Sequence, residues 1–186
     1  MKGFRPTNSH ADSTDTGWAE GMAIVRARGV EGGVAWLNAR TRFRFTGVYR
    51  VDPPNLCNVV LFDRENPSVN VSGEVTLLED TYCSLVYASG AFATPDARKD
   101  ERLTAHAARD SVISYAGVAL RLANGHIWGT LCHFDLRPRL LGEAERHLLE
   151  SVAPVFIDLL KPVDQTKAPF NAPSSKAPRD SDGPRM

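Results

Sequence analysis

Residues 115–135 read YAGVALRLANGHIWGTLCHFD, and they place two apolar runs on either side of Asn124-Gly125. That dipeptide favours a type I′ turn, because both of its residues tolerate positive φ angles. The runs at 115–122 and 127–135 are therefore predicted to pair as an antiparallel hairpin.

Upstream of the hairpin, residues 43–51 alternate between apolar and polar side chains, which is the period of a half-buried strand. Further strands are predicted at 57–63 and, more briefly, at 74–77. Prolines cannot continue a strand ladder, so Asp52-Pro53-Pro54-Asn55 is predicted to be a turn between the first two strands.

Helical spacing of apolar residues predicts two short helices, around 22–25 and 34–37, with glycines such as Gly29 between them. A third helix is expected over 81–88, opened by Asp80 as its N-cap. A long helix is expected over 142–160, with Pro154 kinking or dividing it. The order of elements predicts an α+β domain with one antiparallel sheet and helices packed on one face.

The overall composition narrows the class of protein. The chain has 186 residues, with 22 Lys plus Arg balanced by 22 Asp plus Glu, so no net charge draws it to nucleic acid or anionic lipid. The longest stretch without these charged residues, 81–95, is too short to span a bilayer, and the start of the chain has no signal-peptide core. We therefore expect a cytoplasmic protein that binds neither nucleic acid nor membrane.

The two ends differ from the middle. Residues 1–16 are polar, and residues 162–186 carry five prolines and little apolar surface, so both segments are expected to be disordered. Residues 17–161 remain as one domain. The three cysteines, an odd number without a secretion signal, are expected to be reduced: Cys57, Cys83 and Cys132.

Three stretches resemble a known family. The runs TYCSLVYASGAFATPDARKDERL (81–103), YAGVALRLANGHIWGTLCHFD (115–135) and RPRLLGEAERHLLESVAP (137–154) are similar to the GAF domains of bacterial stand-alone or sensor-linked proteins. The resemblance implies a sheet of about six antiparallel strands, with terminal helices on one face and a ligand pocket on the other, roofed by 81–106. It also implies binding of a small molecule and signalling through the terminal helices.

Six residues of the roof are the candidate ligand-binding residues, because an apolar cavity with a few directed polar groups is typical of small-molecule sites. For each of them a structural role is the alternative: the aromatic residues as core, Asp96 as a loop cap and His106 as a buried structural histidine. The six are Cys83, Tyr87, Phe92, Thr94, Asp96 and His106.

Other site chemistries are disfavoured. Cys132 and His133 are adjacent on a predicted strand, so they point to opposite faces and cannot share one bilin, haem or zinc site. The Asn-Lys-x-x-x-Phe-x-x-x-Asp-Glu signature of cyclic-nucleotide GAF domains is absent, as are the common nucleotide-binding and hydrolase motifs. We assign no catalytic residue, no metal site and no identified cofactor.

The leading hypothesis is a non-catalytic small-molecule sensor that forms a homodimer through its terminal helices and signals to a separate protein. The first alternative is an interaction module whose cavity is filled by its own side chains. The second is a thiol enzyme resembling free methionine-(R)-sulfoxide reductase, in which Cys83 attacks and Cys57 or Cys132 resolves. No Lys or Arg lies beside Cys83 in the sequence to lower its pKa, which argues against this enzyme.

Overall fold

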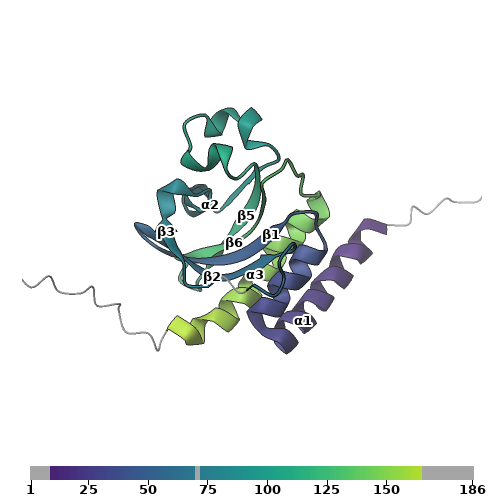
Figure 1. The fold of residues 1–186 in the computed structure, drawn as a ribbon. Coiled ribbons are helices and arrows are strands. Elements are labelled where there is room, and N and C mark those ends of the chain that lie inside the picture. The colour runs from purple at the N-terminus through teal and green to yellow at the C-terminus, as the bar shows by residue number, and fades with distance from the viewer. Residues whose placement is uncertain (1–8, 70–71, 165–186) are drawn as a thin grey trace, which may run out of the picture.

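The sheet has six strands in the order β3-β2-β1-β6-β5-β4, and every neighbouring pair is antiparallel (Figure 1). The computed structural model describes residues 9–69 and 72–164. The strands are β1 (Phe45–Asp52), β2 (Asn55–Asp63), β3 (Val75–Leu77), β4 (Ala91–Thr94), β5 (Ser114–Arg121) and β6 (Ile127–Asp135).

Helices cover both faces of this sheet. Figure 1 shows α1 and α3 together on one face, with α2 and several short 3₁₀ helices on the other. This arrangement confirms the predicted α+β class. The helices are α1 (Ser9–Ala39), η1 (Leu78–Asp80), α2 (Cys83–Ser89), η2 (Ala97–Lys99), η3 (Glu101–Leu103), η4 (Ala107–Asp110) and α3 (Glu143–Asp164).

Helix α3 packs its apolar stripe against both α1 and the sheet. Leu149, Val152 and Phe156 are almost completely buried there, together with Val48 and Leu131 of the sheet. The width of the stripe is therefore explained within one chain, and it does not by itself require a second subunit. The helix is not divided at Pro154, which lies on its exposed side.

Helix α1 consists of two arms that reverse at Gly29, which has a φ of 69°. A Cβ on Gly21 would lie 2.6 Å from the Trp36 ring, so the arms lie side by side. Figure 1 shows the same reversal. The prediction of two helical stretches separated by glycine is confirmed.

Two local predictions need correction. Only Gly125 has a positive φ in the β5–β6 turn, and Asn124 does not, so the turn is not type I′. Its Gly125 N–H donates to the Leu122 carbonyl over 2.9 Å, which is a type I turn closed by a left-handed glycine. The N-cap of α2 is Tyr82 rather than Asp80, because Asp80 already ends η1.

Strand β4 was not predicted. Its sequence, Ala91-Phe92-Ala93-Thr94, is short and half alanine, so it has little strand signal of its own. It becomes a strand because β5 offers a free edge, on which Phe92 pairs with Gly117.

The ends extend beyond the predicted domain. Helix α1 begins at Ser9, eight residues before the predicted boundary at Gly17. Helix α3 ends at Asp164. The rest of the expected disordered ends, residues 1–8 and 165–186, lies outside the described residues. Over the described part of the chain, no helix combines the length and apolar character needed to cross a membrane.

Candidate functional site

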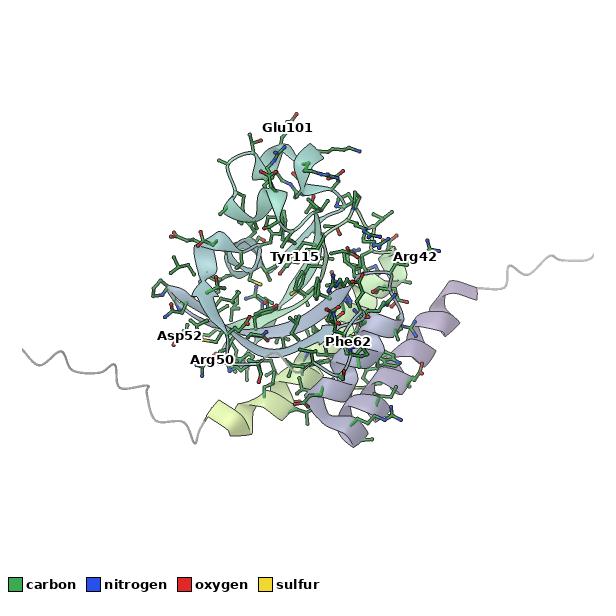
Figure 2. The ribbon with its side chains drawn as sticks, viewed as in Figure 1. Arg42, Arg50, Asp52, Phe62, Glu101 and Tyr115 are labelled. Atoms are coloured by element: carbon green, nitrogen blue, oxygen red, sulfur yellow. The ribbon has the colours of Figure 1, made fainter. Side chains whose placement is uncertain are left out.

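The candidate site lies between the sheet and the segments that cover its second face. We call these segments, residues 78–90 and 95–113, the lid. Alternation along the central strands brings Tyr49 of β1, Tyr115 of β5, and Thr130 and Cys132 of β6 to this face. Figure 2 places Tyr115 in the interior beneath the lid and Glu101 at the lid's outer tip.

Two glycines make room for the two tyrosines. Gly47 and Gly117 both pair with Cys132, one from each side. A Cβ at position 117 would lie 2.5 Å from the Tyr115 hydroxyl oxygen, and one at position 47 would lie 2.8 Å from the Tyr49 ring. Each tyrosine therefore lies over the glycine two residues away, and their rings fill the centre of the roofed face. The expected open cavity is occupied at this point.

Cys83 of α2 completes a buried polar cluster here. Its Sγ lies 3.4 Å from the Tyr115 hydroxyl oxygen, and Thr130 Oγ1 donates to it over 3.2 Å. Hydrogen bonding with Cys132, Thr130 and Tyr115 lowers the pKa of Cys83 although burial opposes it, and burial raises the pKa of Cys132. The lack of a Lys or Arg beside Cys83 along the chain gave no sign of this cluster, because hydrogen bonds can stabilise a thiolate without a positive charge.

Tyr82 links the lid to this cluster. Its ring centroid lies 5.5 Å from that of Tyr115, 5.9 Å from that of Phe92 and 4.6 Å from that of His106. Its hydroxyl donates to the Val112 carbonyl over 3.1 Å. Such ring contacts add specific geometry to a large burial of apolar area.

His106 is held by its backbone neighbours. Its Nδ1 accepts the Ala108 N–H over 3.1 Å, so in the neutral ring the proton belongs on Nε2. That Nε2 is buried, and no acceptor for it lies within the described residues.

An open cleft of about 720 Å³ lies at the edge of the lid, and we call it the lip cleft. Within it, Arg102 holds the Asp100 carboxylate, and this ion pair lowers the pKa of Asp100 to about 2. The lip cleft is lined by Thr94, Pro95, Asp96, Lys99, Asp100, Glu101, Arg102, Pro138, Arg139 and Leu140.

A second cleft, of about 530 Å³, follows the free edge of β4 towards α3. Arg102 lines both clefts. Its guanidinium lies 4.6 Å from the Phe92 ring centroid and donates to the Ala93 carbonyl over 3.0 Å. Ser89 Oγ donates to the Ala91 carbonyl over 2.8 Å. Capping of these edge carbonyls disfavours pairing with a further strand.

The six predicted residues do not share one site. Five of them lie in three different places, and Tyr87 lies apart from these. Cys83 lies in the buried cluster, Phe92 and His106 contact Tyr82, and Thr94 and Asp96 line the lip cleft. Tyr87 is 41% exposed and lines neither cleft, so nothing places it at the site.

Tyr115 and Thr130 were not among the predicted site residues. A signal was present, because Gly117 follows Tyr115 by two residues and so leaves space on the same face of the strand.

The opposite face carries a separate buried network. Thr46 Oγ1 accepts from Asn38 Nδ2 over 2.8 Å and lies 2.7 Å from His133 Nδ1. The Thr46 hydroxyl proton is therefore available for a neutral His133 ring. Cys132 faces the lid while His133 faces α1, which confirms that the two do not share one site.

The stability of the folded chain is expected to decrease as the pH is lowered, because of His133. Burial, together with the charge of Arg64, lowers the pKa of His133 from 6.5 to about 3. Between these values the unfolded chain binds a proton that the folded chain does not, so acid favours unfolding, by at most about 1.4 kcal/mol per pH unit.

Urea unfolding between pH 7.5 and 5 measures this slope, and His133→Gln is expected to flatten it. His126→Gln, on an exposed hairpin residue, is the control and should keep the wild-type slope. The pKa of Asp63 is lowered by its hydrogen bond with Arg44, so this carboxylate titrates below that window. An unchanged slope in His133→Gln would contradict the assignment.

An antiparallel six-stranded sheet with terminal helices on one face and a lid on the other defines a class of α+β domains. The chain belongs to the GAF domain family, whose model matches residues 23–156. No curated protein matches the sequence.

Solved structures with this fold have diverse roles. The GAF domain of an Acinetobacter phosphoenolpyruvate-protein phosphotransferase is 15% identical, with a TM-score of 0.63 over 88% of this chain and 99% of the other. Free methionine-R-sulfoxide reductase from Neisseria meningitidis, in complex with its substrate, is 15% identical, with a TM-score of 0.63 over 89% and 98%.

The chromophore-binding domain of a bacteriophytochrome from R. palustris is 10% identical, with a TM-score of 0.62 over 87% and 64%. At these identities the similarity shows the fold alone, and the fold is shared by sensory proteins and an enzyme.

Proposed function

We propose that this chain is a non-catalytic regulatory GAF domain that binds a small polar molecule in the lip cleft. The observation that carries the proposal is the position of this cleft. One wall is the lid, from Asp96 to Arg102, and the other is residues 138–140, which lead into α3. Its volume of about 720 Å³ is in the range of metabolite sites.

The walls of the cleft carry both signs of charge. Asp96 and Asp100 lie on the lid, and Arg102 and Arg139 offer guanidinium groups with several donors each. A small molecule with an acidic and a basic group, such as an amino acid derivative, suits this lining. The buried Thr94 also lines the cleft, beside Asp100.

The cleft is also connected to the terminal helices. The Arg139 N–H donates to the Pro95 carbonyl over 3.1 Å, and Arg139 Nε donates to Asp135 over 2.8 Å. Helix α3 begins at Glu143, four residues later, and packs against α1. A molecule that moves the lid wall relative to Arg139 would shift the start of α3, and a partner protein or second copy would detect that shift.

Thermal-shift screening with metabolites, amino acids, nucleotides and haem tests this function. At least one compound is expected to stabilise the chain, and Thr94→Val should weaken its binding about tenfold, because it removes one buried hydroxyl without changing size. Tyr87→Phe is the control and should bind as the wild type does. If no compound stabilises the chain, or if Thr94→Val binds unchanged, the proposal fails.

The filled centre of the roofed face favours one other candidate. Tyr49, Tyr82 and Tyr115 occupy the space beneath the lid. An interaction module without a ligand would have such a core and would use the outer faces of α1 and α3, where Trp18 is 43% exposed. A chain that no compound stabilises, but that forms a homodimer of about twice 20.4 kDa in light scattering, would support this module.

Thiol reductase activity is the third candidate, and the buried position of Cys83 argues against it. Cys83 is 3% exposed and Tyr115 lies directly against it, so a methionine sulfoxide has no path to the sulfur without displacing the lid. With dithiothreitol as reductant, we expect no turnover of free methionine sulfoxide. Turnover that is lost in Cys83→Ser would establish the enzyme instead.

A further inference from the structure

Two thiols from different elements meet at the centre of the molecule, and the proposed ligand site uses neither of them. Cys83 is on α2 of the lid and Cys132 is on β6 of the sheet, and both belong to one buried cluster. Cys83 accepts a hydrogen bond from Thr130, which lies two residues before Cys132 on the same face of β6. Both are at least 97% buried. Cys57, the third cysteine, is more exposed and lies on β2.

We propose that Cys83 and Cys132 form an oxidisable dithiol that reacts with a small hydroperoxide, and that the resulting disulfide fastens the lid to the sheet. Cys132 lies between Gly47 and Gly117, so no Cβ from the neighbouring strands stands between it and the lid. The Tyr49 and Tyr115 rings lie over these two glycines. Cys83 packs in the same cluster, beside the Thr130 and Tyr115 hydroxyls.

The surroundings favour Cys83 as the thiol that reacts first. Thr130 donates a hydrogen bond to its sulfur, and the Tyr115 hydroxyl lies within hydrogen-bonding distance of the same sulfur. The pKa of Cys83 is lowered and that of Cys132 is raised, so the thiolate belongs on Cys83. A thiolate, and not a thiol, is the nucleophile in such oxidations.

The reaction balances with hydrogen peroxide as the oxidant. The Cys83 thiolate attacks one peroxide oxygen and the O–O bond breaks, which leaves a sulfenic acid and a hydroxide that takes up a proton as water. The Cys132 sulfur then attacks the Cys83 sulfur. The S–O bond breaks, and the departing hydroxide takes the Cys132 proton as a second water. Two thiols lose two electrons, and one peroxide gains them.

Because both sulfurs are buried, they are expected to react with a small oxidant in preference to a bulky reagent. A small hydroperoxide can reach the sulfurs through brief opening of the lid, whereas a bulky thiol reagent requires a much larger opening. The disulfide would join residues that are 49 positions apart, which restricts the unfolded chain and holds α2 against β6. Oxidation is therefore expected to stabilise the closed lid.

The test uses the full-length reduced chain, treated with increasing hydrogen peroxide, then alkylated and examined by intact mass and peptide mapping. We expect a loss of about 2 Da before alkylation. After alkylation of the denatured chain we expect two fewer alkyl groups than on the reduced chain and a peptide that links Cys83 to Cys132, and dithiothreitol added before alkylation should reverse all of these changes. We also expect the melting midpoint of the oxidised chain to rise by about 5–10 °C. Cys57→Ser is the matched control and should behave as the wild type does.

Two variants test the order of the steps. Cys132→Ser should accumulate a sulfenic acid on Cys83 that dimedone traps, while Cys83→Ser should leave Cys132 as a free thiol. Circular dichroism of both serine variants, and of Cys83→Ala, shows whether each chain is folded before treatment. A disulfide that includes Cys57, or oxidation of Cys57 while Cys83 and Cys132 stay reduced, would overturn the proposal.

Discussion

Gly129→Ala is expected to destabilise the chain by more than about 3 kcal/mol, which is a large part of the stability of a domain of this size. A Cβ at this position would lie 2.1 Å from the Tyr49 carbonyl oxygen and 3.2 Å from the Arg50 Cα. Both atoms belong to the backbone of β1, so no side-chain rotation relieves the overlap. The chain can accept the methyl group only by separating β1 from β6 at the middle of the sheet.

Urea unfolding followed by circular dichroism measures this effect. The variant is expected to unfold at a much lower urea concentration than the wild type, or to be recovered only as insoluble protein. Gly142→Ala is the control, because a methyl group there would meet no other part of the described chain within 4 Å and its φ is not positive. Equal urea midpoints for Gly129→Ala and the wild type would show that the two strands are further apart than described.

Tyr82→Ala is expected to cost about 3–5 kcal/mol, the range for removing a large buried aromatic side chain. Tyr82 is 2% exposed and contacts the rings of Phe92, His106 and Tyr115. Its removal would also leave the Val112 carbonyl without the Tyr82 hydrogen bond. These contacts hold the lid against the sheet. In Tyr82→Ala the amide hydrogens of the lid should therefore exchange faster than in the wild type, and this increase should be larger for the lid than for β1 and β6.

Tyr87→Ala is the matched control, since it removes the same type of side chain from a position that is 41% exposed on α2, the helix that Tyr82 precedes as N-cap. Its effect should stay within about 0.5 kcal/mol. Hydrogen exchange followed by mass spectrometry separates the two variants. Tyr82→Ala with lid exchange as slow as in the wild type would show that other contacts hold the lid in place.

The sequence predicted some strands of the fold but not others. Alternation in 43–51 and the paired runs at 115–122 and 127–135 predicted strands that the structure confirms, because half-buried strands leave a period-two pattern. Strand β4 left no such pattern, since it has only four residues and two of them are alanine, which is depleted in strands. The turn at Asn124-Gly125 was placed correctly but given the wrong type, because only Gly125 adopts a positive φ.

The candidate site was predicted only in part. The sequence pointed to the segment that forms the lid, and Thr94 and Asp96 do line the lip cleft. It did not show that Tyr87 is exposed or that Cys83 meets Thr130, which is 47 residues away in the chain. No local rule relates residues at such a separation, so this part required the three-dimensional arrangement.

The sequence by itself determined the α+β class, the main strands and helices, and the opposite orientation of Cys132 and His133. Periodicity and strand alternation are local properties, and each can be read from a few neighbouring residues. Only the tertiary structure decided that two tyrosines fill the space above Gly47 and Gly117, and that Cys83 and Cys132 lie together beneath the lid. Those outcomes depend on how three strands and a lid helix pack, and close packing of distant segments is a property of the folded chain as a whole.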